Sequence, residues 1–297
     1  MILEDAASQI VSVLIPVRDR YDYRIINLLN SLKFQTYPKE LIEIILLDCG
    51  SDKSFVPKFN EIRDRFQIKG IQLESHGWNK SYALNRGIES TSGKYILVSD
   101  VDMIFEKNYI AACIEIITSN SLQALYCCSM DSPEGSIVGE IDLAKDYNEL
   151  KKACSPRVGA PGFPYGVGIL FAPKELVLRV NGYDEFYKLW GFEDIDIVRR
   201  LQALGVVLTE ISDRTSYIHQ WHAKYEGVKD KNEFEGSLER NKKYFKLKEA
   251  NINLKRDYEH CKVERNKFKA EITRIHSLKG YKVLQFLYKI YNLIFRK

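Results

Sequence analysis

The sequence predicts an α/β fold built on a parallel, doubly wound sheet, and two observations support this. Short apolar segments alternate with segments of helical spacing in the N-terminal third of the chain, and strands that alternate with helices are typical of parallel sheets covered on both faces. The chain has 297 residues, of which 45% are hydrophobic and 28% charged. It is therefore long enough and apolar enough to bury a core, which excludes a disordered protein.

The predicted strands are four short apolar runs, at residues 11–17, 42–47, 70–73 and 94–99. The apolar spacing of helices is found at residues 23–33, 80–90, 173–180 and 195–204. Residues 155–168 contain seven Pro and Gly, which predicts a shaped loop. Because ligands of doubly wound sheets bind at the carboxyl ends of the strands, polar residues that directly follow a strand are candidates for a site.

The C-terminal segment differs from the rest of the chain in charge and periodicity. Residues 240–297 contain 17 Lys and Arg against 5 Asp and Glu, whereas the remainder contains 27 against 35. From residue 244 to 275, apolar residues recur in a 4-3 rhythm, which predicts a long helix with a coiled-coil-like seam. Such a seam is a candidate homodimer contact.

Residues 281–297 combine a wide apolar face with a narrow polar stripe, formed by Lys282, Gln285, Lys289, Asn292 and Arg296. This pattern is typical of a helix that lies in the headgroup plane of a membrane, and packing on another protein surface is the alternative. A basic tail suggests nucleic acid or acidic lipid as a partner. The aromatic residues on the apolar face favour lipid, so we expect no nucleic-acid partner.

Membrane crossing and export are not expected. The sequence has no run of 18 apolar residues, and its N-terminus lacks the basic start and apolar run of a secretory signal. We expect a cytoplasmic protein, peripheral on the inner face of the cell membrane, with its six cysteines present as thiols.

Two groups of residues have the character of metal ligands. Asp100 and Asp102 follow a predicted strand, and side chains two residues apart in an extended chain point the same way. Two such carboxylates suit a divalent cation, although a solvated turn is the ordinary alternative. His219 and His222 can complete a metal shell, whereas each taken alone is more often a hydrogen-bonded structural histidine.

Two further groups suggest binding and proton transfer. Glu193, Asp194 and Asp196 open a predicted helix, and Trp190-Gly191 lies one residue before them. The helix macrodipole explains one or two acids there, and a third suggests a carboxylate that takes a proton from an acceptor hydroxyl. Arg18 and Arg20 end the first strand and can hold a diphosphate, with a charged loop as the alternative.

In chain order these segments resemble the nucleotide-sugar glycosyltransferases of the GT-A fold, of the family 2 type. Several are similar to segments of beta-1,4-galactosyltransferases and chondroitin-polymerase-type enzymes. Pro16-Val17-Arg18-Asp19-Arg20 resembles Pro-Phe-Arg-Asn-Arg, and Ser99 to Ile104 resembles Ser-Asp-Val-Asp-Leu-Ile. Trp190 to Asp196 resembles Trp-Gly-Gly-Glu-Asp-Asp-Asp, and His219-x-x-His222 falls where that family has Met-x-x-His. The resemblance covers roughly residues 10–225, and Val17 and Phe192 depart from the family pattern.

The resemblance implies a single GT-A catalytic domain with a C-terminal helical tail. Its parts are a donor-binding half (1–110), an acceptor-binding and catalytic half (111–235) and a helical basic tail (236–297). The implied reaction is an inverting transfer from a nucleotide sugar, a UDP-hexose or UDP-N-acetylhexosamine, to a hydroxyl of a glycan or lipid-linked glycan. The implied setting is the synthesis of a surface polysaccharide or glycolipid.

The resemblance also assigns roles to residues. Asp102, His222 and His219 would hold Mn²⁺ or Mg²⁺, Asp194 would be the base and Glu193 would orient the acceptor. Donor contacts would come from Pro16, Arg18, Arg20, Asp48 and Asp100, and acceptor contacts from Trp190, Gly191 and Tyr165.

Two other functions remain as alternatives. They are a nucleotidyltransferase of similar topology and an inactive scaffold that binds nucleotide sugars. Glu193-Asp194 and the histidine pair argue against the first, and the intact acids at every motif argue against the second.

Overall fold

The structure is a computed structural model that describes residues 9–75, 77–119, 122–157, 166–223, 226, 230–277 and 279–295. The chain forms two compact units, Met1–Phe245 and Lys246–Lys297. The first unit therefore extends past residue 235, where the sequence places the end of the catalytic domain.

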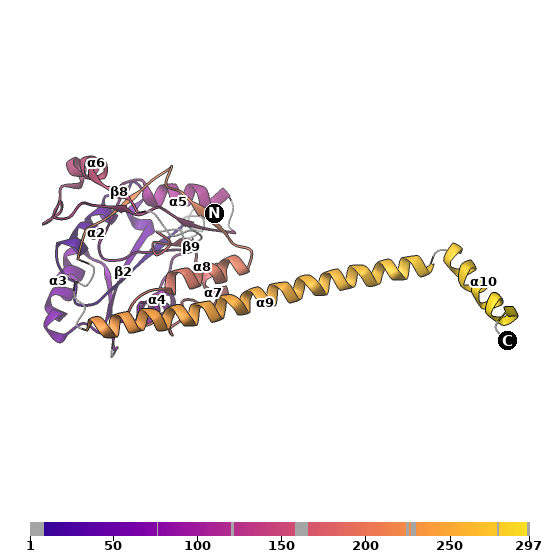
Figure 1. Cartoon of the computed structure of the whole chain (residues 1–297). Coiled ribbons are helices and arrows are strands. Elements are labelled where there is room, and N and C mark those ends of the chain that lie inside the picture. The colour runs from indigo at the N-terminus through magenta and orange to yellow at the C-terminus, as the bar shows by residue number, and fades with distance from the viewer. Residues whose placement is uncertain are drawn as a thin grey trace. The chain divides into compact units, whose positions relative to one another are not determined.

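A seven-stranded sheet forms the centre of the first unit (Figure 1). Its strand order is β10 (Val207–Glu210), β6 (Gln123–Tyr126), β9 (Phe171–Pro173), β4 (Tyr95–Val98), β1 (Val11–Val17), β2 (Ile42–Cys49) and β3 (Lys69–Leu73). β4, β1, β2 and β3 are parallel, which confirms the four predicted strands. The sheet is mixed rather than wholly parallel, because β9 runs antiparallel to both of its neighbours.

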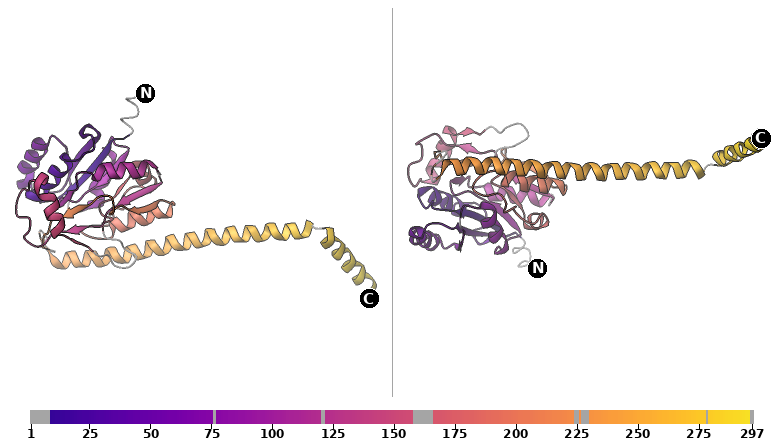
Figure 2. Two further views of the ribbon diagram at one scale, coloured as in Figure 1. Left: turned by 90° about the horizontal axis from the view of Figure 1, so that it is seen from above. Right: turned by 60° about the horizontal axis from the view of Figure 1, so that its bottom comes forward.

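Helices cover both faces of this sheet because successive strand residues point to opposite sides. Along β1, for example, Val13 and Ile15 join one apolar cluster and Leu14 joins the other. The first cluster also contains α2 (Tyr23–Lys33), α3 (Val56–Phe66) and α5 (Tyr109–Ser119). The second contains α4 (Lys80–Glu89), α7 (Lys174–Arg179) and α8 (Glu193–Ala203). Figure 2 shows these layers from two further directions.

A second, four-stranded sheet places the candidate ligands. Its order is β5 (Met103–Phe105), β11 (Tyr217–His219), β7 (Met130–Asp131) and β8 (Ser155–Pro156). β5 begins directly after Asp102, and in the antiparallel β5–β11 pair His219 lies opposite Met103. The pairing therefore brings the aspartate and histidine motifs together. Among the described residues before α9, the remaining elements are α6 (Leu143–Ala153) and two short 3₁₀ helices, η1 (Lys39–Leu41) and η2 (Lys53–Phe55).

The long helix predicted for the tail is present as α9 (Lys231–Ser277), and α10 (Lys279–Phe295) follows it. Tyr244, predicted as the first residue of the seam, has another role. It stacks on Phe186 at 3.9 Å between ring centroids and donates to Asp184 Oδ2 at 3.0 Å, because the first turns of α9 pack on the first unit. Among the described residues, no helix combines the length and apolar character needed to cross a bilayer.

Candidate active site

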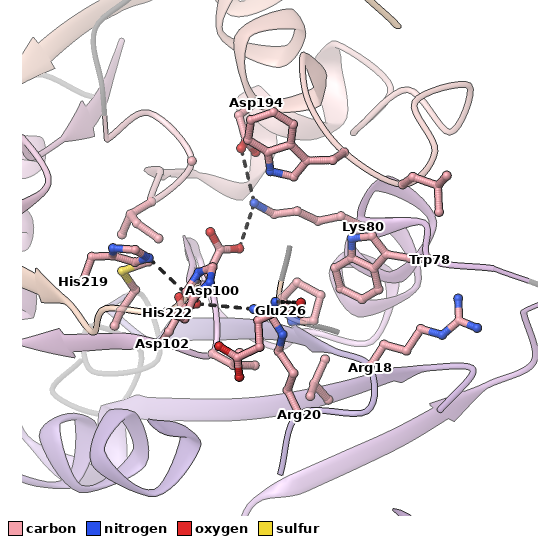
Figure 3. Close-up of a pocket in the computed structure, with 18 of the residues that line it drawn as sticks. Arg18, Arg20, Trp78, Lys80, Asp100, Asp102, Asp194, His219, His222 and Glu226 are labelled. Atoms are coloured by element: carbon pink, nitrogen blue, oxygen red, sulfur yellow. Dashed lines mark hydrogen bonds and ion pairs between the residues drawn. The ribbon is translucent and has the colours of Figure 1, made fainter. Parts of the chain in front are cut away.

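A cavity of about 910 Å³ opens at the carboxyl ends of β1 and β4. Most of the predicted site residues line it, namely Pro16, Arg18, Arg20, Asp100, Asp102, Trp190, Glu193, Asp194, His219 and His222. They come from the β1 and β4 ends, the start of α8, and β11 with the residues that follow it. Segments far apart in the chain therefore share one hollow (Figure 3).

Asp102, His219 and His222 form a cluster whose ligand atoms all lie within 4.8 Å of one another. Asp102 Oδ2 is 3.3 Å from His222 Nε2 and 3.9 Å from His219 Nε2. The other carboxylate oxygen, Asp102 Oδ1, is buried and accepts no hydrogen bond. A buried carboxylate oxygen without a partner is costly unless a cation is bound, so these three residues fit a divalent metal.

The Nδ1 side of the His219 ring faces Asp131 of β7. Strand pairing places Asp131 beside His219, and Nδ1 of the ring lies 3.2 Å from Asp131 Oδ1. When Nδ1 donates to this carboxylate, Nε2 keeps a free lone pair directed toward Asp102. Arg157 in turn donates from Nε to Asp131 Oδ2 at 2.6 Å. Burial alone would raise the pKa of Asp131, but the hydrogen bonds from His219 and Arg157 outweigh burial and lower it.

Arg20 connects the cluster to the carboxyl end of β1. Arg20 Nη1 lies 3.6 Å from Asp102 Oδ2, and Arg20 Nη2 donates to the backbone oxygen of Glu226 at 2.9 Å. The Glu226 side chain accepts from Arg24 on α2. Arg18 carries no such anchor to the cluster and points to a different part of the cavity (Figure 3). The two guanidinium groups place positive charge on the part of the cavity wall next to the end of β1.

Lys80 is the cation at the centre of the cavity. Its ammonium group lies 2.9 Å from Asp100 Oδ1 and 3.3 Å from Asp194 Oδ2, and so bridges the β4 end and the start of α8 (Figure 3). Burial lowers the pKa of Lys80, but the carboxylates of Asp100, Asp194 and Glu193 outweigh burial and raise it well above its ordinary value. Lys80 is therefore a permanent cation that holds Asp194.

Two carboxyl groups at the start of α8 have raised pKa values. Burial, with the neighbouring Asp194 charge, raises the pKa of Glu193 to about 7. Burial also raises the pKa of Asp194, and Lys80 opposes that rise. One Asp194 oxygen is buried without a hydrogen-bond partner. A carboxylate with a raised pKa and a free oxygen is suited to accept a proton near neutral pH.

The backbone before α8 is shaped to present these acids. Gly191 has φ of +94° and Phe192, the residue before the helix, has φ of 76°. Positive φ values suit glycine and are uncommon for phenylalanine, so Phe192 is held there by its surroundings. Gly168 leaves room for Asp194, since a Cβ at this glycine would come within 2.8 Å of Asp194 Oδ2.

Two predicted residues do not line the cavity, and a third is not among the described residues. Asp48 does not line the cavity; it is buried at the end of β2, where its Oδ1 accepts from the Ser51 backbone N–H at 3.0 Å. Gly191 is near the cavity but is not part of its lining. Tyr165 lies outside the described residues.

Sequence reasoning assigned no role to Lys80, Asp131 or Arg157. The available signal for Lys80 was its position as the first residue of the helix predicted at 80–90. Asp131 and Arg157 carry no local signal, because strand pairing alone brings them to His219.

The chain matches two family models that adjoin one another. The model described as Glycosyl transferase family 2 matches residues 12–153, and the model described as N-terminal domain of galactosyltransferase matches residues 152–224. The chain is 26% identical to a probable glycosyltransferase of Sulfolobus acidocaldarius, over 65% of this chain and 42% of that protein. It is 24% identical to chondroitin sulfate synthase 3 of Homo sapiens, over 66% of this chain and 23% of that protein. The chain spans less than half the length of both relatives.

Two solved structures show the same fold. The structure of GalNAc-T7 with UDP, GalNAc and Mn²⁺ superimposes with a TM-score of 0.56 at 17% identity, over 73% of this chain and 44% of that one. TarS 1–349 of S. aureus with UDP-GlcNAc has a TM-score of 0.56 at 17% identity, over 77% and 64%. These structures show that the chain has the GT-A fold, and the two matched models show that its sequence is similar to the glycosyltransferases of family 2 over residues 12–153 and to galactosyltransferases over residues 152–224.

Proposed function

We propose that this chain transfers a hexose or N-acetylhexosamine from a UDP-sugar to a hydroxyl of a glycan acceptor, with inversion at the anomeric carbon. The observation that carries the proposal is a single cavity that contains both the Asp102–His219–His222 cluster and the Asp194 carboxylate. Solved relatives of the same fold bind UDP or UDP-GlcNAc. Donor and acceptor chemistry would then meet between β4 and α8.

On the donor side, Arg18 and Arg20 would bind the diphosphate oxygens, and Pro16 and Asp100 would line the nucleoside and sugar. Asp102, His219 and His222 would hold a divalent cation, Mn²⁺ or Mg²⁺, because a mixed carboxylate and imidazole shell suits Mn²⁺ better than Ca²⁺. Such a cation neutralises charge on a nucleoside diphosphate as it departs. Asp48, at the end of β2, would contribute to binding of the nucleoside.

On the acceptor side, Asp194 would take the proton from the attacking hydroxyl. Lys80 holds Asp194 Oδ2 at 3.3 Å, which leaves the unpartnered oxygen free to act. Glu193 would orient the acceptor, with Trp190 at the cavity rim. Attack from the face opposite the departing UDP inverts the anomeric configuration.

The test is a panel of UDP-sugars incubated with Mn²⁺ and glycoside acceptors, with UDP release and product formation measured together. Asp194→Asn should lower transfer by at least about 100-fold with donor binding near normal, since losing a general base costs about 10²–10⁴ in rate. Glu193→Gln is the matched variant. If Glu193→Gln loses turnover while Asp194→Asn keeps it, the two acids have exchanged roles; full activity in EDTA would exclude the metal site.

We also propose a setting for this reaction. The apolar face of α10 and the basic residues before it would bring the chain to the inner face of a membrane, where a lipid-linked glycan would be the acceptor for surface polysaccharide or glycolipid synthesis. A homodimer through the exposed part of the seam within residues 244–275 is the accompanying proposal.

A further inference from the structure

The first turns of α9 belong to the cavity. Both matched family segments end by residue 224, yet Asp230, Glu233 and Phe234 line the same cavity as Asp194. Residues 231–245 lie in the first compact unit, and the start of α9 lies against that unit in Figure 2. The helix therefore contributes to the site from outside the segment on which the family resemblance rests.

Asn241 and Ser237 hold the turn that precedes α8. The Asn241 amide lies 3.0, 3.1 and 3.2 Å from the carbonyl oxygens of Lys188, Trp190 and Gly191, to which it donates. The Ser237 hydroxyl donates to the Lys188 carbonyl at 2.6 Å. Both side chains are buried. Buried polar groups with several partners specify one backbone arrangement, so α9 fixes the 188–191 turn.

Apolar contacts act on the same turn. A Cβ at Gly191 would come within 2.9 Å of Leu238 Cδ1, which shows how closely α9 approaches the backbone there. Phe192 packs on Phe245 with ring centroids 5.4 Å apart. Glu193 and Asp194 follow this turn directly, so the position of both acids depends on α9.

An aromatic surface is built across the junction. Phe234 of α9 stacks on Trp190, with ring centroids 5.4 Å apart and planes inclined by 24°. Trp190 is 51% exposed, so part of its ring faces the open cavity, and Asp230 and Glu233 lie on the same wall. A pyranose ring has an apolar face and hydroxyl groups at its edge. An aromatic ring can pack on that face while neighbouring carboxylates accept hydrogen bonds from the hydroxyl groups.

We infer that α9 completes the acceptor subsite, with Trp190 and Phe234 binding a sugar ring of the acceptor and Asn241 positioning Trp190 and the base. The inference rests on the proposed function and adds residues that lie beyond the resemblance. Asn241 touches no substrate in this scheme and acts through the turn that it holds.

The test compares acceptor and donor constants in Phe234→Ala and Asn241→Ala. The acceptors are p-nitrophenyl β-glycosides of glucose, galactose, N-acetylglucosamine, N-acetylgalactosamine and glucuronic acid. We expect Phe234→Ala to raise the acceptor KM by about tenfold, which is near the upper end of the effects of losing one aromatic contact. The donor KM should stay within about twofold of wild type. Asn241→Ala should lower kcat as well, because it also displaces Asp194.

Lys243→Ala is the control, since Lys243 lies on the same helix with its side chain 74% exposed and should leave all constants unchanged. If Asn241→Ala does not fold, Phe234→Ala still tests whether α9 binds the acceptor, because Phe234 is only half-buried. An unchanged acceptor KM, or equal changes in both KM values, would reduce α9 to a structural support and overturn the inference. A wild type that hydrolyses a donor but uses none of the glycosides would overturn the sugar assignment. A wild type that releases no UDP would refute the proposed function instead.

Discussion

Asp131 contributes no ligand to the proposed metal site, yet its carboxylate selects the nitrogen of His219 that faces Asp102. Nδ1 of the ring lies between Asp131 Oδ1 at 3.2 Å and Arg157 Nη2 at 3.3 Å. When the Nδ1–H group donates a hydrogen bond to Asp131, Nε2 carries no proton and its lone pair can bind a cation. If Nδ1 instead accepted from Arg157, the proton would be on Nε2. The ion pair between Arg157 and Asp131 keeps that carboxylate charged and in place.

Asp131→Asn should therefore lower the affinity for Mn²⁺ by about 10–100-fold, the range typical of residues that orient a metal-bound histidine. Calorimetric titration of the full chain with MnCl₂ measures this without substrate. Glu134→Gln, an exposed change shortly after β7, should bind Mn²⁺ as wild type does. Equal affinity in wild type and Asp131→Asn would mean that His219 needs no such support.

Glu193 links the site to the pH dependence of stability. Its pKa is raised to about 7 in the folded protein by burial and by Asp194, against an ordinary value of 4.5. Between these pH values the folded state binds the proton more strongly than the unfolded state. The free energy of unfolding should therefore fall as pH rises through this window, by at most about 1.4 kcal/mol per pH unit from this group.

Glu193→Gln should flatten that slope, because glutamine does not titrate. Urea denaturation in EDTA at pH 5, 6, 7 and 8 gives the free energy of unfolding for both proteins. Glu175→Gln, an exposed position on α7, should keep the wild-type slope. A slope that Glu193→Gln leaves untouched would assign the pH dependence to other groups, Asp194 first.

At the scale of elements, the approach of α4 to the sheet positions Lys80. Gly87 lies in the last turn of α4, and a Cβ there would come within 2.6 Å of Leu47 and 3.0 Å of Leu14. The absence of a side chain therefore lets the helix pack directly on β1 and β2. Lys80, at the first turn of the same helix, reaches Asp100 and Asp194 from this position.

Gly87→Ala should destabilise the protein by about 1–3 kcal/mol through overpacking, although alanine favours a helix by about 0.5–1 kcal/mol over glycine. Gly236 on α9 is the matched control, since nothing lies within 4 Å of a Cβ there. Gly236→Ala should stabilise by about 0.5–1 kcal/mol. Urea midpoints that shift in the same direction for both variants would contradict this account of α4.

At the scale of the whole molecule, charge is distributed unevenly along the chain. The body of the chain before residue 240 is acidic, whereas residues 240–297 carry 17 basic and 5 acidic side chains. Large apolar side chains of α10 are exposed, including Leu284, Phe286 and Leu287. A basic segment beside an exposed apolar helix has the chemistry of a surface that binds anionic lipid, with about 1 kcal/mol from each well-placed cation.

The full chain should therefore float with vesicles of phosphatidylglycerol and phosphatidylcholine, whereas a chain that ends at Ser277 should stay at the bottom of the gradient. Leu287→Glu places a charge on the apolar face and should abolish flotation, while Gln285→Glu changes only the polar stripe and should float. Salt should weaken the binding of the full chain by screening the basic residues. If the full chain stays unbound at low salt, α10 packs on protein instead, and light scattering would detect a second copy.

The sequence by itself determined the local features of this protein. Strands 11–17, 42–47, 70–73 and 94–99, the helices at 23–33 and 80–90, and the tail helix all follow from apolar periodicity, which is a property of neighbouring residues. The same local reasoning selected the acids, arginines and histidines that line the cavity. It missed the helices α3, α5 and α6, the strands β6, β9 and β10, and the second sheet. These strands have two to four residues each, too few to show a periodicity.

The tertiary structure alone decided which distant residues act together. His219 meets Asp131 across 88 positions of sequence, and Lys80 meets Asp194 across 114. Asn241 reaches Trp190 across 51 positions by helix packing. Such contacts depend on strand register and on how closely helices approach a sheet, and no periodicity within a segment specifies either one. For Asp48 the tertiary structure adds a contact with the Ser51 backbone N–H at the end of β2, and its donor contact stays a prediction.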